Sequence, residues 1–118
     1  MPRVRISINI NVRLLLVTAG LAGVLAGCAA RLPEPNAADA ARAGKTWPGT
    51  TVSDLHRGKQ QYVQRCAACH GLIDPHQFQA GRWPGFVKEM SGKLRISESD
   101  VVDLTRYLVV AAESTPTP

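Results

Sequence analysis

Aromatic side chains are scarce in this chain of 118 residues, at 5% of the total. A chain of this length permits one small domain, and a small domain buries a modest fraction of its surface. A core built from side chains alone would be thin, so we expect another group to fill part of it. The chain also lacks convincing runs of alternating strand residues, which favours an all-α domain.

Other absences narrow the class of function. No dense basic stripe is present, which argues against a nucleic-acid partner. There is no Ser-His-Asp arrangement and no pair of carboxylates that would form one catalytic site, so we expect no substrate turnover. The chain has three cysteines, Cys28, Cys66 and Cys69. An odd number excludes a complete set of disulfides and calls for other cysteine chemistry.

The first 27 residues have the pattern of an export signal. Residues 1–13 contain three arginines and no acidic residue, and residues 14–27 are apolar and small. This pattern is typical of a secretory signal peptide, and the apolar run is shorter than the roughly 20 residues that span a bilayer. Without this segment the chain has 11 Lys and Arg against 9 Asp and Glu, which is typical of a mixed soluble surface.

The apolar run ends in Leu25-Ala26-Gly27-Cys28, which resembles the lipobox of bacterial lipoproteins. The resemblance implies cleavage after Gly27 and a diacylglycerol on the Cys28 thiol, so that lipid anchors the exported chain on the periplasmic side of a membrane. By resemblance to lipoprotein sorting, Ala29 after the cysteine favours the outer membrane. The alternative is ordinary signal cleavage beside a chance cysteine.

The part of the chain that follows Cys28 is divided by composition. Residues 28–52 are rich in Ala and Pro, which predicts a lipidated N-terminus and a flexible tether with an end-to-end distance of roughly 25–30 Å. Residues 53–113 carry helical periodicity, and residues 114–118 predict a disordered tail. The sequence therefore predicts one helical domain between a tether and a short tail.

Three helices are expected in this domain, each from a start signal. One begins near Ser53, one near Pro84 and one after Ser97, where Asp100 occupies the third position of a capping box. The apolar positions at helical spacing are Leu55, Gly58, Tyr62 and Cys66 in the first helix, Trp83, Phe86, Val87 and Met90 in the second, and Val101, Leu104, Leu108 and Ala111 in the third.

The stretch Cys66-Ala67-Ala68-Cys69-His70 is typical of the covalent attachment of one c-type haem. Two cysteines three positions apart lie on nearly the same side of a helical turn, and the histidine that follows can face the iron. A thioredoxin-like redox pair would need a βαβ context, and a zinc site would need more ligands, for which only His56 and His76 are available. A chance match is the third alternative.

Residues 58–71 resemble the N-terminal helix and haem motif of the class I cytochrome c family, and Leu104, Tyr107 and Leu108 resemble its C-terminal helix, which crosses the first helix near the glycine. The resemblance covers about residues 53–110. It implies a small helical domain around one haem c, attached through Cys66 and Cys69, with His70 as the proximal iron ligand. It also implies that the Pro75 carbonyl accepts a hydrogen bond from His70, although a simple loop turn is an equal alternative.

Met90 is the candidate for the second axial ligand. The stretch from Trp83 to Met90 resembles short cytochromes that have a tryptophan, a helix and then a methionine, although Met90 follows His70 at a shorter spacing than in larger members. The alternatives are that Met90 fills the core, that His76 or His56 ligates, or that the iron stays open. Trp83 would pack against the haem edge, with a hydrogen bond from its indole to a propionate as a further option.

The resulting expectation is a membrane-anchored, monohaem electron carrier on the periplasmic side. It would dock transiently with redox partner proteins, either as a monomer or as a subunit of a larger redox complex. The alternatives are a haem subunit of a periplasmic oxidoreductase and an open-iron haem protein with a peroxidase or sensor role.

Overall fold

The structure, a computed structural model, describes residues 32–116, and all of its regular elements are helical. The α-helices are α2 (Ala37–Thr46), α3 (Val52–Gln61), α4 (Trp83–Ser91) and α5 (Glu98–Glu113). A π-helical turn, η1 (Tyr62–Cys66), continues α3, and two short 3₁₀ turns, η2 (Pro75–Gln77) and η3 (Ala80–Arg82), precede α4. Within the described part of the chain there is no strand, which confirms the expectation of an all-α domain.

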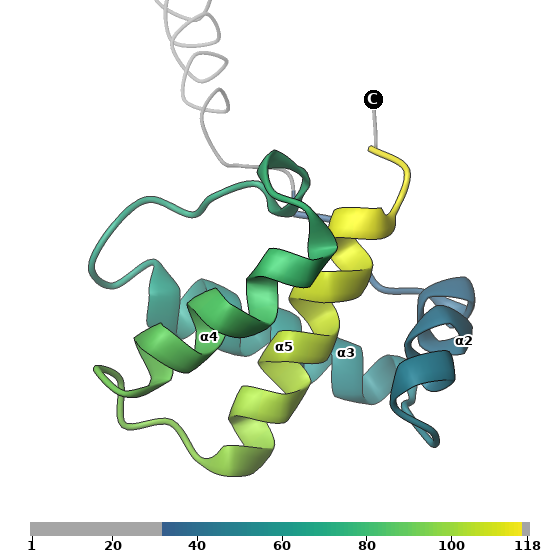
Figure 1. The fold of residues 1–118 in the computed structure, drawn as a ribbon, viewed down its shortest axis with the longest axis horizontal. Helices are drawn as coiled ribbons and strands as arrows, with labels where there is room; N and C mark the ends of the chain where they lie inside the picture. Colours follow the sequence, from purple (N-terminus) through teal and green to yellow (C-terminus); the bar gives the residue numbers. More distant parts are fainter. Residues whose placement is uncertain (1–31, 117–118) are drawn as a thin grey trace, which may run out of the picture.

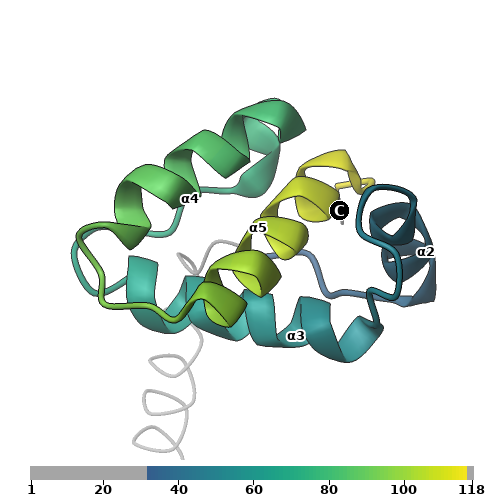
Figure 2. The ribbon, with the colours of Figure 1, turned by 60° about the horizontal axis from the view of Figure 1, so that its bottom comes forward.

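Helix α5 is the centre of the arrangement and contacts α2, α3, α4, η2 and η3. Figure 1 shows α3 behind α5 and α2 at one side, and Figure 2 shows α5 between α4 and α3. The main core gathers around the buried residues of α5, with the other helices contributing from both sides. Its fully buried members are Tyr62, Trp83, Val87, Leu104, Tyr107, Leu108 and Ala111.

The helices α3 and α5 meet at Gly58. A Cβ atom at this position would lie 2.1 Å from the carbonyl oxygen of Asp103 and 2.7 Å from the Cβ of Tyr107. Only a residue without a side chain allows the two backbones to come this close. Beside the crossing, the Arg57 Nε atom lies 3.0 Å from a carboxylate oxygen of Asp103, which adds an ion pair between the same two helices.

The expected helix starts are close to the observed ones. Helix α3 begins at Val52 because Thr51, and not the expected Ser53, is its N-cap and forms a reciprocal capping box with Asp54. The Thr51 backbone N–H and hydroxyl donate to the Asp54 carboxylate and hold its pKa below the usual value. Ser97 is the N-cap of α5 and accepts from the Asp100 N–H, and Pro84 lies in the first turn of α4, as expected. The expected capping box is only half formed, because the Asp100 side chain does not bond back to the Ser97 backbone N–H.

The N-terminal boundary of the domain needs correction. Residues 28–52 were expected to form a flexible tether and the domain to begin at residue 53, but α2 lies within that range and packs against α3 and α5. Ala43 of α2 is 1% exposed and forms a second core with Leu55 and Val110. Alanine side chains give a helix little apolar bulk, so the sequence shows no bulky apolar stripe that would predict α2. The same small side chains allow the helix to approach its neighbours closely.

The segment before α2 is also held to the body of the domain. Leu32 packs against the main core, and the Pro33 carbonyl accepts a hydrogen bond of 3.0 Å from the Tyr107 hydroxyl. The Glu34 carboxylate pairs with Lys59 and lies 3.2 Å from the His56 ring. We call residues 32–36 the strap, because they run across α3 and α5 without regular structure of their own.

Ser114, the residue that follows α5, is held to the domain. Its backbone carbonyl oxygen lies 2.9 Å from the His76 ring, and its hydroxyl donates to the Ala111 carbonyl. The expected tail at 114–118 therefore begins at least one residue later. The expected signal peptide at residues 1–27 and the lipidation site Cys28 lie outside the described residues. Among the helices of residues 32–116, none has the length and apolar character needed to cross a bilayer.

The α3–α5 crossing generates a prediction for Gly58→Ala. The added methyl group would overlap backbone atoms that have no room to move, and overpacking of this kind costs about 1–3 kcal/mol and occasionally more. We expect the free energy of unfolding in urea to fall by at least about 2 kcal/mol.

Gly44→Ala is the matched control, because Gly44 is also inside a helix but no atom lies within 4 Å of its added Cβ. Alanine has a higher helix propensity by about 1 kcal/mol, so this variant should be slightly more stable than the wild type. Equal stability of the two variants would contradict the close crossing.

The packing of α2 predicts resistance to trypsin after Arg42 and Lys45. A helix docked on the body must open before a protease can cut it, so we expect cleavage there to be at least about tenfold slower than in the urea-unfolded chain, which corresponds to an opening free energy of about 1.4 kcal/mol. Cleavage after the exposed Lys93 and Arg95, between α4 and α5, serves as the control for protease access. If Arg42 is cut before these sites, the region is a tether after all.

Candidate functional site

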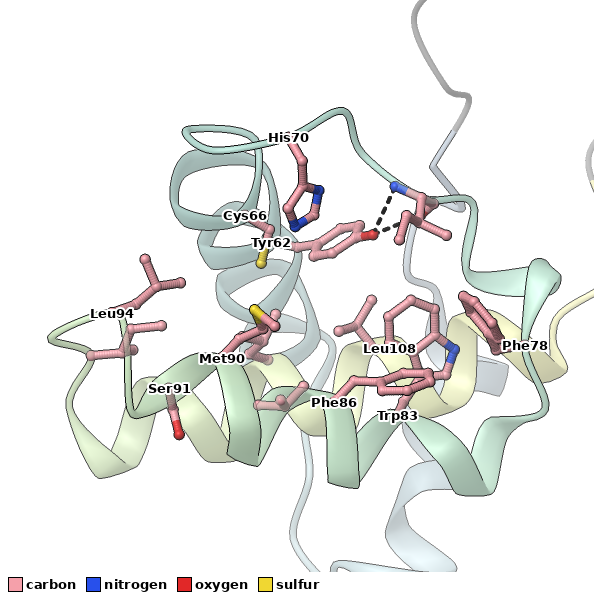
Figure 3. Close-up of a pocket in the computed structure, with 14 residues that line it drawn as sticks. Tyr62, Cys66, His70, Phe78, Trp83, Phe86, Met90, Ser91, Leu94 and Leu108 are labelled. Atoms are coloured by element: carbon pink, nitrogen blue, oxygen red, sulfur yellow. Dashed lines mark hydrogen bonds between the residues drawn. The ribbon is translucent and has the colours of Figure 1, made fainter.

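The main hollow of the described residues lies between α4 on one side and η1 with α5 on the other. Its empty volume is about 700 Å³, including a part open to solvent, and its walls are almost entirely apolar. Figure 3 shows its lining, which includes Tyr62, Cys66, His70, Phe78, Trp83, Phe86, Met90, Leu94 and Leu108.

Aromatic rings form one wall of this hollow. Trp83 meets the rings of Phe78 and Phe86 edge to face, with centroids 5.8 and 5.7 Å apart, and it also meets Tyr62 at 6.2 Å. Four of the six aromatic residues of the chain therefore line a space instead of filling it. Phe78 was not identified from the sequence, since it lies in a loop outside every periodic stretch.

The two cysteines of the motif lie at the end of the π-helical turn. Both are free thiols. Cys66 is half-buried and lines the hollow, and burial raises the pKa of its thiol, whereas Cys69 is exposed at the edge. Single π-helical turns inside helices occur frequently at functional sites. Here the turn lies directly before the loop that carries His70.

His70 presents a free ring nitrogen. Its Nδ1 atom lies 2.7 Å from the Gly71 carbonyl oxygen, which can only accept, so Nδ1 carries the proton of the neutral ring. The Nε2 atom then has a lone pair, which is the form of imidazole that binds a metal ion. Figure 3 shows the ring turned toward the hollow.

Met90 lies on the other side of the hollow from His70. It comes from the last part of α4, and its thioether sulfur points into the hollow (Figure 3). A second hollow continues the first around the edge and is lined by Arg65, Cys66, Cys69, His70, Met90, Lys93 and Leu94. The structure thus brings the two cysteines expected to attach a haem and the two expected iron ligands, His70 and Met90, to one place. Two basic residues, Arg65 and Lys93, lie at its rim.

Of the two roles considered for Pro75, the structure supports the loop turn, η2, over a hydrogen bond to His70. The Pro75 carbonyl accepts a hydrogen bond of 3.1 Å from the Trp83 indole N–H, while His70 pairs with the carbonyl of its own neighbour Gly71. A buried indole N–H needs an acceptor, and the Pro75 carbonyl supplies it. The same bond occupies the Trp83 N–H that was considered as a donor to a haem propionate, so Trp83 packs in the wall and ties it to η2.

The rival histidines are engaged elsewhere. His56 is exposed on α3 and pairs with Glu34, away from the hollow. His76 is partly buried, with Nδ1 2.8 Å from Asp74 and Nε2 2.9 Å from the Ser114 carbonyl. The His76 backbone N–H and its ring lower the pKa of Asp74. Neither histidine lines the hollow, and residues 32–116 contain no group of three or more His, Cys, Asp and Glu that could hold a metal ion.

The tyrosine at the floor of the site was expected only as an apolar position. Its hydroxyl donates to the Ile73 carbonyl at 2.6 Å and accepts from the Ile73 N–H at 3.1 Å (Figure 3). Burial raises the pKa of Tyr62 to about 12, so the hydroxyl keeps its proton. These two bonds hold the loop that follows His70, which positions that histidine at the edge of the hollow.

The residues present fit a covalently attached haem. Two free thiols, an imidazole with a free Nε2 atom and a thioether border one apolar space, and the aromatic wall offers a water-poor surface for a macrocycle. The comparisons with protein-family models, with curated proteins and with solved structures each returned no match.

The bond network of Tyr62 predicts a pH dependence. The folded-state pKa of about 12 exceeds the value of 10.0 for a free tyrosine, so the native chain binds more protons between these values and the stability should fall as the pH rises from 10 to 12. We expect the melting temperature of Tyr62→Phe to decline less over this range.

At neutral pH the same variant should lose about 1–3 kcal/mol of stability, because two backbone groups of Ile73 lose their partner. Burial also raises the pKa of Tyr107, so this residue should contribute to the loss of stability at alkaline pH as well. The contribution of Tyr107 should remain in Tyr62→Phe and diminish in Tyr107→Phe. An unchanged alkaline profile in Tyr62→Phe would contradict the burial of this hydroxyl.

Proposed function

We propose that this chain is an exported, lipid-anchored, monohaem c-type cytochrome that carries electrons. The observation that supports this most strongly is the position of Met90. It lies 20 residues beyond His70 in the sequence and on helix α4, yet it faces the same apolar hollow from the opposite side. The Cys-x-x-Cys-His motif alone predicts attachment of a haem. The Met90 thioether would complete, together with His70, the His/Met ligand pair that is typical of electron carriers.

Each residue has a defined part in the proposed site. Cys66 and Cys69 would hold the haem through thioether bonds, and His70 would bind the iron through Nε2. Met90 would be the second protein ligand of the iron, and a methionine ligand raises the reduction potential relative to a bis-histidine site. When bound, the haem supplies a one-electron couple between ferrous and ferric iron. The chain needs no substrate pocket for this function, only a cofactor edge that partner proteins can approach.

The protein environment would set the potential and exclude water. The wall of Trp83, Phe86 and Phe78 surrounds the hollow with low polarity, and η2 holds that wall through the Pro75–Trp83 bond. Cys69 is exposed, and Arg65 and Lys93 flank the hollow on the same side. We place the path of electron entry and exit at this edge, through weak and transient docking.

The test is to express the full chain in cells equipped for haem attachment and to record its absorption spectra. We expect haem that resists acid-acetone extraction, and a weak near-infrared band of methionine-ligated ferric iron. Met90→Ala should keep covalent haem, lose the near-infrared band, shift to a lower potential and bind carbon monoxide readily when reduced.

His56→Gln and His76→Gln are the matched controls, since each removes a histidine that lies outside the hollow. Both should keep the wild-type spectrum. If the near-infrared band is missing in the wild type and a histidine variant changes the spectrum, the axial pair is bis-histidine. An open iron in the wild type would favour the peroxidase or sensor role, and a folded chain without covalent haem would overturn the proposal.

A further inference from the structure

The strap limits the distance between the domain and a lipid on Cys28. The body of the domain holds the chain from Leu32 onward through the Tyr107–Pro33 hydrogen bond, the Glu34 ion pairs and the burial of Pro35. Leu32 is only four residues after Cys28. Four residues span at most about 13–14 Å, however they are arranged.

This reach is short compared with the domain itself. A domain of this size has a radius of gyration of about 12 Å and is therefore roughly 30 Å wide. A chain link shorter than the width of the domain keeps it from turning freely above a membrane. The expected tether, by contrast, would have allowed excursions of about 25–30 Å.

We propose that the strap holds the domain against the surface of the lipid bilayer, with the strap-bearing face turned toward the headgroups. That face is formed by residues 32–36 where they pass the last turns of α5 (Figure 1), and Tyr107 of α5 supplies the hydrogen bond that fixes them there. The inference rests on the proposed function, specifically on lipidation of Cys28. It identifies the bilayer surface as a constant partner, so redox proteins must meet this carrier at that surface.

The geometry keeps the cofactor site accessible in this position. The strap is bonded to α3 and α5, through Lys59, His56 and Tyr107, and none of its residues lines the two hollows. Met90 and Lys93 lie at the end of α4 and just beyond it, on an element that the strap does not contact through any of these bonds. A domain seated on its strap can therefore still present its basic rim to a protein at the same surface.

The experiment measures the height of the protein layer by neutron reflectometry. The full-length, lipid-modified protein is placed on supported bilayers of phosphatidylethanolamine and phosphatidylglycerol. We expect the protein layer to begin at the headgroups with no water-filled gap. In a variant with a flexible Gly/Ser linker of about 16 residues between Ala30 and Arg31, the layer should move outward and broaden by roughly 20–24 Å.

A second variant tests the strap directly. Tyr107→Phe combined with Glu34→Gln removes the hydrogen bond to Pro33 and weakens the Glu34 pairs, and the release of residues 32–34 adds at most about 10–11 Å of reach, so this layer should lie between the other two. A wild-type layer as far from the bilayer as that of the linker variant would overturn the proposal.

Two controls separate this result from the proposed function. Cys28→Ser should leave no layer, and absence of a layer with the wild type as well would overturn the anchor and the inference together. Because reflectometry does not depend on the cofactor, the absorption spectrum of the same sample reports independently whether haem is attached. A chain without haem that still sits at the headgroups would contradict the electron-carrier proposal and leave the strap supported.

Discussion

The close approach of α3 and α5 at Gly58 is the constraint on which the rest of the structure depends. It brings the backbone carbonyl of Asp103 to within van der Waals contact of α3, and it leaves no space for any side chain at the crossing. From this point α3 continues through η1 to Cys66, so the crossing determines where the stretch from Cys66 to His70 begins. On α5 the same contact places Leu104 and Leu108 under the hollow and Tyr107 against the strap.

Two buried tyrosines then fix two of the segments that have no regular structure. Tyr62 on η1 bonds both backbone groups of Ile73 in the loop after His70, and Tyr107 on α5 bonds the carbonyl of Pro33 in the strap. Irregular segments cannot satisfy their own backbone polar groups, and buried groups without partners are costly. Burial raises the pKa of both hydroxyls, so each remains a donor over the whole physiological range.

Much of the fold could be predicted from local signals, and the exceptions have physical reasons. Ser97, Pro84 and the apolar spacing identified α4 and α5 nearly to the residue, because caps and periodicity act within one turn. Helix α2 was missed although Asn36 and Asp39 form a capping box, since a helix whose buried face is mainly alanine has no bulky stripe. The position of Pro75 depends on its bond to Trp83, and no sequence pattern encodes which buried donor a carbonyl will meet.

The candidate site shows the same division between local and tertiary information. Cys66, Cys69 and His70 are neighbours in the sequence, so their common position follows from the helical turn alone. Met90 reaches them only because α4 packs against α5 with Trp83 and Val87 buried, which turns the end of α4 toward η1. Four of the six aromatic residues of the chain take part in that packing or line the wall of the hollow. A chain with so few aromatic residues has few bulky side chains with which to fill the space between α4 and η1. An apolar group that is not part of the chain could bury the apolar surface that these side chains leave uncovered.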